Sequence, residues 1–484
     1  MTLSSARETR PDPLPAPATP FVGRGSMASG LRGARLVRWA VLAGTLTLAT
    51  ALLLSVTTVV AATDPNLQSF QDPSGTLATF STSGAIDTGN PFFQSLGTNG
   101  RTCNSCHQAS DGWTVTPPHI QARFNATGGT DPIFRPNDGS NSPNADVSSV
   151  SARQKAYSML LSKGLIRVGL PIPDNAEFTL QKVDDPYGFA SAKELSLFRR
   201  PLPSTNLKFL STVMWDGRET IQKITDSGDL KADLTHQATD ATLGHAQASS
   251  PPTAEQLQQI VAFETALFTA QQQDNDAGDL GTQGAKGGPV PLSHQDFFIG
   301  VNDPLGGNPT GAQFNNVVFN IFDAWSSLTG DRLSVARGES IFNNRNFAIT
   351  GVGGLADIEK DKGHCTICHD APNVGNHSLS APLNIGLADA SRRTPDMPLY
   401  TLRNTTTHET VQTTDPGRAL ISGKWADIGK FKGPILRGLA ARAPYFHNGS
   451  AANLDEVVDF YNSRFSLGLS AQEHRDLVAF LRTL

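Results

Sequence analysis

The chain has 484 residues and carries 39 basic against 44 acidic side chains, a formal net charge of −5. This length is enough for two or three domains. The charge balance argues against nucleic acid as a partner and favours a mildly acidic, soluble surface.

The N-terminal segment, residues 1–62, has the pattern of an export signal. Arginines at positions 24, 32, 35 and 38 precede an almost uninterrupted apolar run over residues 39–62, and small residues at 60–62 would allow cleavage before Thr63. The run is also long enough to remain as a single membrane anchor, but cleavage is the preferred interpretation. In either case we expect the body of the protein to lie outside the cytoplasm, in the periplasm.

Every cysteine of the chain belongs to one of two Cys-x-x-Cys-His motifs. On one helical turn the two thiols and the following imidazole share a face, so the thiols can bond to haem vinyl groups while the histidine ligates the iron. A zinc site or a redox disulfide is the alternative, but the two motifs lie in opposite halves of the chain and a histidine follows both. The sequence therefore predicts two covalently bound haem c groups, attached through Cys103, Cys106, His107, Cys365, Cys368 and His369.

Around the first motif, a haem domain is expected over residues 63–272. Helices are predicted over 91–96, 151–163 and 253–272, and a run rich in Gly, Asn, Asp and Pro at 128–145 predicts a long loop. The last of these helices is predicted from apolar residues at helical spacing, namely Ile260, Phe263, Leu267 and Phe268.

A second haem domain is expected over residues 314–484, after a linker or loop region at 273–313. Helices are predicted over 331–342, 454–461 and 471–484, and strand signals are sparse. The expected class is therefore mostly α, with two cytochrome-c-like haem domains and long ordered loops. The apolar face of the last helix is predicted to contain Leu477, Val478, Phe480 and Leu481.

A sequence pattern is repeated after each haem motif. A basic, proline-containing stretch at 199–203 leads to Met-Trp-Asp-Gly at 214–217, and a similar stretch at 431–438 leads to Phe-His-Asn-Gly at 446–449. This repetition indicates duplication of a one-haem domain and predicts a pseudo-two-fold arrangement.

At these motifs the sequence resembles the bacterial dihaem cytochrome c peroxidase family, which includes the MauG-type enzymes that oxidise protein side chains. The resemblance extends over about residues 90–484. It implies that peroxide meets the N-terminal haem, whose proximal ligand is His107. It also implies that Trp215 lies between the haems and relays electrons, and that the C-terminal haem has His369 and Tyr461 as axial ligands.

At the position of Tyr461, other family members have methionine and the MauG-type enzymes have tyrosine. After export only Met159, Met214 and Met397 would remain, and none lies in the helix after His447, which agrees with tyrosine. A phenolate favours ferric and higher oxidation states, whereas a thioether favours ferrous iron. The alternative is that Tyr461 only packs in a terminal helix.

The resemblance also implies a distal glutamate after a Gln-Ala segment, which moves a proton between the peroxide oxygens. Here Gln247 is nearest to that position, and glutamine cannot transfer a proton. His245 could do so near neutral pH and is the predicted acid/base. An axial ligand of the first haem or a structural histidine are the alternatives for His245, and His119 and His236 are weaker candidates for that ligand.

Two further groups of residues are implied by the resemblance. Arg437 and His447 are expected to contact haem propionates, since a guanidinium pairs well with carboxylates. The family places calcium between the domains, using an asparagine and carbonyl oxygens near Pro444. Arg200 lies roughly where that asparagine is expected, and a cation beside a cation is unfavourable, which weighs against calcium here.

The function implied is that of an exported dihaem oxidoreductase of the peroxidase/MauG class. It would react with hydrogen peroxide and take electrons from a small cytochrome c, a cupredoxin or an oxidisable protein side chain. One alternative is a non-catalytic dihaem electron carrier, which the missing glutamate favours. The other is a dihaem dioxygenase acting on an organic substrate, with the loops at 128–145 and 273–313 as walls of a substrate channel.

Overall fold

The computed structural model describes residues 63–221 and 224–484. The expected signal or anchor segment, with the apolar run at 39–62, lies outside the described residues. Within the described part of the chain, no helix is both long enough and apolar enough to cross a membrane.

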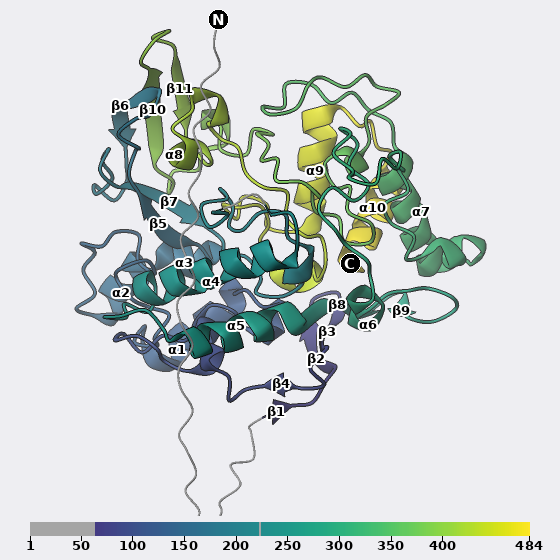
Figure 1. Cartoon of the computed structure of the whole chain (residues 1–484), viewed down its shortest axis with the longest axis horizontal. Coiled ribbons are helices and arrows are strands. Elements are labelled where there is room, and N and C mark those ends of the chain that lie inside the picture. The colour runs from purple at the N-terminus through teal and green to yellow at the C-terminus, as the bar shows by residue number, and fades with distance from the viewer. Residues whose placement is uncertain (1–62, 222–223) are drawn as a thin grey trace, which may run out of the picture. The chain divides into compact units, whose positions relative to one another are not determined.

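The first half of the described chain contributes the helices α1 to α5 (Figure 1). The Asp226 side chain caps the N-terminus of α4, and α5 begins with a capping box between Thr253 and Gln256. The bounds are α1 Pro117–Thr127, α2 Val150–Ala156, α3 Ser158–Lys163, α4 Ser227–Gly244 and α5 Ala254–Ala266.

The helix predicted over 253–272 is too long. It ends at Ala266, and Leu267–Asp274 continues as strand β8. Leu267 and Phe268, predicted on a helical face, are instead buried in this strand, which pairs with β3 near the start of the described chain. Pairing with the distant strand β3 therefore overrides the helical spacing of the apolar residues, because the backbone groups of this segment form hydrogen bonds in a sheet and not in a helix.

Two smaller predictions in this half also change. The helix expected over 151–163 is divided into α2 and α3 at Tyr157, and the helix expected over 91–96 is a short 3₁₀ turn at Pro91–Phe93. The long loop predicted at 128–145 is confirmed, since no helix or strand occurs in that range.

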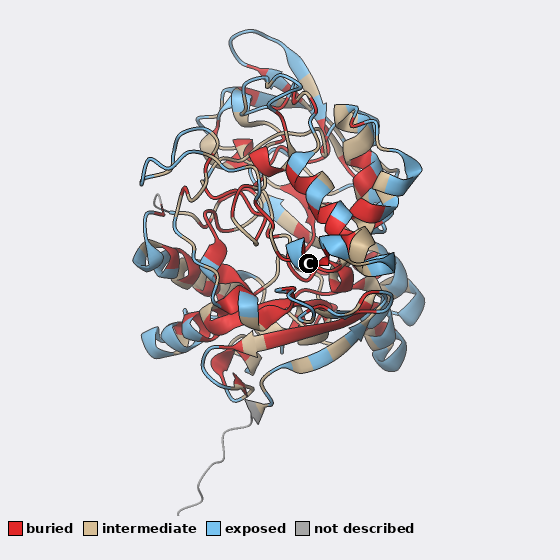
Figure 2. Ribbon diagram, turned by 90° about the vertical axis from the view of Figure 1, so that its right-hand side faces the viewer, coloured by how far each residue is buried: buried red, intermediate tan, exposed pale blue. Residues whose placement is uncertain are grey.

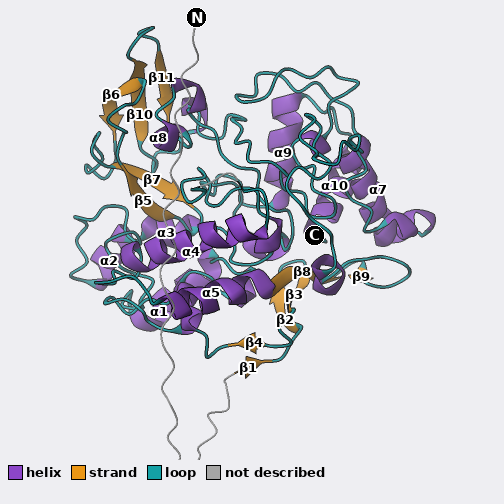
Figure 3. Ribbon diagram, viewed as in Figure 1, coloured by secondary structure: helices purple, strands orange, loops and turns teal. Residues whose placement is uncertain are grey.

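The sheets are the main correction to a mostly-α class (Figure 3). Four small antiparallel sheets form, in the orders β1-β4, β2-β3-β8-β9, β5-β7 and β11-β10-β6. Several of the pairs, such as β3 with β8 and β6 with β10, join strands that are distant in sequence, so local patterns predicted them poorly. The bounds are β1 Thr63–Asp64, β2 Gln68–Asp72, β3 Gly75–Ser81, β4 Ile86–Asp87, β5 Ile166–Leu170, β6 Phe178–Asp184, β7 Leu195–Arg199, β8 Leu267–Asp274, β9 Gly278–Asp279, β10 Leu399–Asn404 and β11 Thr410–Thr413.

The region 273–313 is not a linker without structure. It contains the end of β8, the short strand β9 and helix α6 at Pro289–Ser293. Residues 294–313 then form an irregular loop. This region is therefore partly built into the fold.

The helices of the second half match their predictions closely. α10 packs closely against α7 at Gly338 of α7. A larger residue would not fit there, because its Cβ would lie 1.9 Å from the carbonyl oxygen of Asp476 in α10. Leu477, Phe480 and Leu481 of α10 are buried as predicted, and Val478 is partly buried. Figure 2 shows that buried and exposed residues alternate along the helices of the protein. The bounds are α7 Gly330–Asn344, α8 Ala419–Ser422, α9 Leu454–Phe465 and α10 Ala471–Arg482.

Strand pairing and buried ion pairs join the two halves. β6 of the first half pairs with β10 of the second, from Phe178 opposite Asn404 to Asp184 opposite Leu399. Arg199 of the first half bonds Asp415 of the second through two nitrogens, at 2.7 and 2.9 Å. The described residues, 63–221 and 224–484, accordingly belong to one compact unit.

Candidate functional site

Two cavities of the structure are each lined by one Cys-x-x-Cys-His motif. In both motifs the segment starting at the first cysteine forms a 3₁₀ turn. The first cavity, here called the N-terminal cavity, is lined by Cys103, Cys106 and His107. The second, the C-terminal cavity, is lined by Cys365, Cys368 and His369.

The two motif histidines are held in the same way. Nδ1 of His107 lies 3.0 Å from the carbonyl oxygen of Trp113, and Nδ1 of His369 lies 2.6 Å from that of Gly375, six residues after the histidine in both cases. A carbonyl oxygen can only accept, so Nδ1 carries the proton and Nε2 keeps its lone pair for a metal. Burial lowers the pKa of both imidazoles to about 4, so both are neutral near pH 7. These features fit haem iron.

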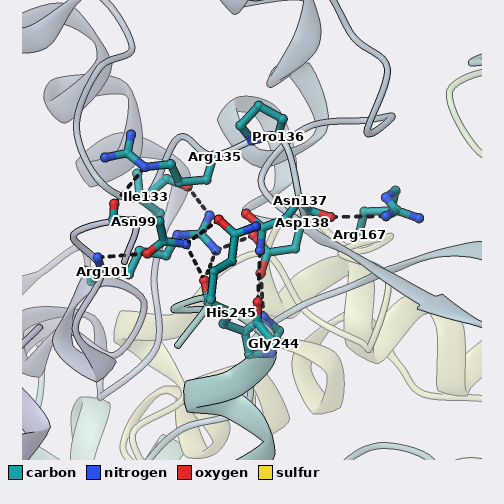
Figure 4. A network of polar contacts seen from close by, with 12 residues as sticks. Asn99, Arg101, Ile133, Arg135, Pro136, Asn137, Asp138, Arg167, Gly244 and His245 are labelled. Carbon is teal, nitrogen blue, oxygen red and sulfur yellow. Dashed lines mark hydrogen bonds and ion pairs between the residues drawn. The ribbon is translucent and has the colours of Figure 1, made fainter. Parts of the chain in front are cut away.

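His245 lies where an acid/base for the N-terminal cavity is needed. It follows α4 directly and lines the same cavity as His107. Its Nδ1 bonds the carboxylate of Asp138, which also forms an ion pair with Arg101 (Figure 4). This arrangement orients the imidazole and leaves Nε2 available to a ligand.

Asp138 and Arg101 were not predicted from the sequence. Burial raises the pKa of the Asp138 carboxyl, but Arg101 and His245 outweigh it and bring the pKa below its usual value. Asp138 is therefore ionised near neutral pH. It comes from the loop at 128–149, so only the folded chain brings it to His245.

The other predicted polar residues of this region lie outside the lining of the N-terminal cavity. Gln247 is exposed and accepts a hydrogen bond from Asn99 at 3.2 Å. The His119 side chain is 53% exposed and bonds Asp111, and the His236 side chain is 42% exposed and bonds Glu219 at 2.7 Å. None of the three is placed to act on a molecule bound in the cavity that His107 lines.

A buried carboxylic acid in the N-terminal cavity also escaped prediction. Glu264 of α5 is 5% exposed and lines the cavity. Its burial outweighs a hydrogen bond from Ser204 and raises the pKa to about 7. In the sequence it looked like any polar residue of an amphipathic helix.

The C-terminal cavity contains Tyr461 and His447 beside the haem motif. Burial, reinforced by the neighbouring Cys368 and Cys365, raises the pKa of the Tyr461 phenol well above its usual value. Both ring nitrogens of His447 are buried and have no hydrogen-bond partner among the described residues. A polar ligand group in this cavity would satisfy them, which agrees with the predicted propionate contact.

Arg437 is placed differently from its prediction. It is buried but does not line the C-terminal cavity. Its Nε donates to the carbonyl oxygen of Leu484 at 3.0 Å, and Nη1 to that of Asn373 at 2.8 Å. In this arrangement it ties the C-terminus to the loop after the second haem motif.

The repeated turns, 214–217 and 446–449, have the same backbone conformation. Met214 and Phe446 have φ of +68° and +67°, and each turn ends in a glycine with positive φ. Contacts between the two halves are reciprocal. The backbone N–H of Lys432 donates to the carbonyl oxygen of Trp215 at 2.9 Å, and the backbone N–H of Arg200 donates to the carbonyl oxygen of His447 at 2.6 Å. Reciprocal contacts are what a two-fold relation produces.

Trp215 lies where the two cavities approach each other. It lines the C-terminal cavity, while its neighbour Met214 lines the N-terminal one. Its Nε1 donates to the carbonyl oxygen of Arg200 at 2.8 Å, and its ring centroid lies 6.3 Å from that of His447. Lys432, which also escaped prediction, lines both cavities and donates through Nζ to the carbonyl oxygen of Thr212.

The residues near Pro444 do not fit a calcium ion. The buried guanidinium of Arg200 donates to the carbonyl oxygens of Lys163 and Arg442, both at 3.0 Å. The positively charged guanidinium of Arg200 thus already bonds carbonyl oxygens close to Pro444, and it would repel a divalent ion placed beside it.

Comparisons with curated proteins find similarity to cytochrome-c peroxidases and to MauG. The chain is 36% identical over 138 residues to the cytochrome-c peroxidase IdrP2 of Denitromonas iodatirespirans, covering 26% of this chain and 38% of that protein. It is 30% identical over 186 residues to IdrP1 of the same organism, covering 34% and 44%. It is also 43% identical over 65 residues to the methylamine utilization protein MauG of Methylorubrum extorquens, covering 11% and 18%.

The chain therefore resembles proteins of the cytochrome c peroxidase and MauG-like family over part of its length. No family model matches it, and the matched segments span less than half of the first relatives. Among solved structures, a MauG-like protein associated with microbial copper homeostasis covers 82% of this chain and 86% of its own, at 16% identity and a TM-score of 0.38. Proteins of the cytochrome c peroxidase and MauG-like family carry c-type haem, and both cavities have the residues to hold it.

Proposed function

We propose that this chain is an exported dihaem oxidoreductase of the cytochrome c peroxidase and MauG-like family, which reacts with hydrogen peroxide in its N-terminal cavity. One observation carries the proposal: His245, oriented by Asp138, lines the same cavity as Cys103, Cys106 and His107. A bound haem iron would supply the place where one peroxide oxygen is coordinated and reduced. The chain supplies the thiols, the proximal imidazole and the proton transfer.

The proton transfer is assigned to Nε2 of His245. It accepts the proton of the inner peroxide oxygen and delivers it to the outer one, so that the O–O bond breaks with water as the leaving group. The ionised Asp138 carboxylate holds Nδ1–H and stabilises the imidazolium that forms in between. This role replaces the distal glutamate that the sequence lacks, and Gln247 has no part in it.

Electron exchange with the C-terminal cavity is assigned to Trp215. The reciprocal contacts of Trp215, Lys432, Arg200 and His447 support a pseudo-two-fold arrangement of two haem-binding halves, 63–272 and 314–484. Tyr461 is proposed to hold the C-terminal haem iron together with His369, because both would face a haem bound in one cavity of otherwise mainly apolar residues. Such a site favours storage of oxidising equivalents.

The remaining assignments rest on the sequence. Residues 1–62 are proposed to direct export to the periplasm, from the arginines and the apolar run. The source of electrons is proposed to be a small cytochrome c, a cupredoxin or an oxidisable protein side chain, and calcium is not part of the proposal.

The experiment is a stopped-flow measurement of the haem-loaded protein mixed with hydrogen peroxide. His245→Gln is expected to slow the spectral reaction by about 10²- to 10⁴-fold, with haem content unchanged. His236→Gln is the matched control, because His236 lies in α4, the helix that His245 directly follows, but is outside the cavity. Equal rates for His245→Gln and the parent protein would contradict the proposal.

Two further outcomes identify the alternatives. Two low-spin haems that do not respond to peroxide would indicate a dihaem electron carrier. Oxygen-dependent conversion of an organic substrate without added peroxide would indicate a dioxygenase.

A further inference from the structure

A cluster of three buried side chains next to the second haem motif has no role in the peroxide reaction. It consists of Asp303, Asp370 and His377, which are 2%, 0% and 4% exposed. One oxygen of each carboxylate and one nitrogen of the imidazole lie within 4.8 Å of one another. Buried carboxylates this close together need a compensating positive charge or a proton.

The hydrogen bonds of the cluster leave one oxygen unused. Oδ2 of Asp303 accepts from the backbone N–H groups of Leu305 at 3.0 Å and Gly307 at 2.6 Å, but Oδ1 is buried without a hydrogen-bond partner among the described residues. Among the described residues, no lysine or arginine forms an ion pair with Asp303 or Asp370. The cluster therefore lacks a cation on the side of Asp303.

The geometry of the other two residues suits a shared ion. Nδ1 of His377 and Oδ2 of Asp370 form a hydrogen bond of 3.1 Å. An ion would replace the shared proton with little movement, because two ligands of a tetrahedral ion with bonds of about 2.1 Å lie about 3.4 Å apart. Calcium and magnesium prefer shells made of oxygen alone, whereas imidazole together with carboxylates suits zinc and similar ions. We propose that Asp303, Asp370 and His377 bind a divalent transition-metal ion, with zinc as the best fit.

Such an ion would fix the loop that orients the second haem histidine. The loop from Asp370 to His377 contains Gly375, whose carbonyl oxygen accepts from His369. The carbonyl oxygen of His377 in turn accepts from the Ser211 hydroxyl of the first half at 2.7 Å. His377 also lines the C-terminal cavity. The proposed site does not depend on the peroxidase assignment, because binding of an ion by these three residues needs no reaction with peroxide.

The test is the metal content of the haem-loaded full chain, purified without chelators and measured by plasma mass spectrometry. We expect about one zinc per chain in addition to iron. Asp303→Asn keeps the shape of the side chain but removes its charge, and it is expected to lose the zinc. Asp240→Asn is the matched control, because it changes an exposed carboxylate of the other three-residue grouping, with Glu219 and His236, and should retain the zinc.

A second readout does not depend on the variants. Removal of zinc from the parent protein with a chelator should lower the Tm, and added zinc should restore it by mass action. The low-spin EPR signal of the C-terminal haem should shift on removal and return on addition. A chain that contains no second metal and shows no change of Tm with added Zn²⁺ or Mn²⁺ would overturn the proposal, as would zinc retained by Asp303→Asn.

Discussion

Asp138 accepts a hydrogen bond from Nδ1 of His245, although 107 positions separate the two residues along the chain. The same carboxylate is paired with the buried Arg101, so its position and charge are fixed before any ligand enters the cavity. An aspartate behind a histidine selects the tautomer in which Nε2 can accept a proton.

Asp138→Asn is therefore expected to slow the reaction with peroxide, on the order of 10²-fold. An amide can bond the imidazole but cannot stabilise its cation. Stopped-flow rates over pH 5–9, with haem content as the control for folding, measure this effect. A rate equal to that of the parent protein would show that His245 works without Asp138.

Tyr461→Phe is expected to change the low-spin EPR signal of the C-terminal haem and leave the N-terminal haem signal as it was. The reason is that Tyr461 lines the cavity of Cys365, Cys368 and His369 only. Tyr445→Phe is the comparison variant, since the Tyr445 hydroxyl in the same cavity already donates to the carbonyl oxygen of Leu439 at 2.9 Å. Identical spectra for Tyr461→Phe and the parent would leave Tyr461 as a packing residue.

Arg199→Met is expected to destabilise the protein by about 3–5 kcal/mol, because it removes the cation that two buried carboxylates share and leaves only Arg218 beside one of them, Asp216. Arg199 is 2% exposed and bonds both Asp216, next to Trp215, and Asp415. Denaturant unfolding at pH 7 measures the loss. A surface pair gives the control: Lys362→Met, which removes an exposed partner of Glu359, should change stability by less than about 1 kcal/mol.

Chelation of calcium is expected to leave the protein unchanged. Arg200 already uses the carbonyl oxygens of Lys163 and Arg442, so treatment with EGTA followed by addition of Zn²⁺, which EGTA also binds, should affect neither the Tm nor the haem spectra. Arg200→Asn should lower stability by about 1–3 kcal/mol for each carbonyl oxygen left unpaired. A Tm of the parent protein that stays low after EGTA and Zn²⁺ and recovers with calcium would refute this expectation.

Glu264→Gln is expected to flatten the dependence of stability on pH. Burial raises the folded-state pKa of Glu264 to about 7, above its ordinary value of 4.5. The folded state therefore holds a proton that the unfolded state releases, so this contribution is full below pH 4.5 and is lost as pH rises through about 7. The loss is about 3 kcal/mol. Unfolding curves at pH 5, 6, 7 and 8 should show a shallower slope in the variant, and parallel curves would argue against the raised pKa.

The sequence alone determined the features that depend on short spacing. Two cysteines and a histidine within five residues predict haem attachment wherever the motif stands in a fold. The amphipathic helices α7, α9 and α10 follow from apolar residues three and four positions apart. The repeated turns at 214–217 and 446–449 were also visible in the sequence, because each needs a glycine at its end.

Only the tertiary structure decided which residues work together. The pairing of β6 with β10, the partnership of Asp138 with His245, and the occupation by Arg200 of carbonyl oxygens near Pro444 all join segments far apart in the chain. Such contacts leave no periodic pattern in the sequence, since each end is compatible with many partners until the chain folds. Burial also depends on the folded chain. It raises the pKa of Glu264 and leaves Oδ1 of Asp303 without a hydrogen-bond partner among the described residues, and neither effect can be read from the residue type alone.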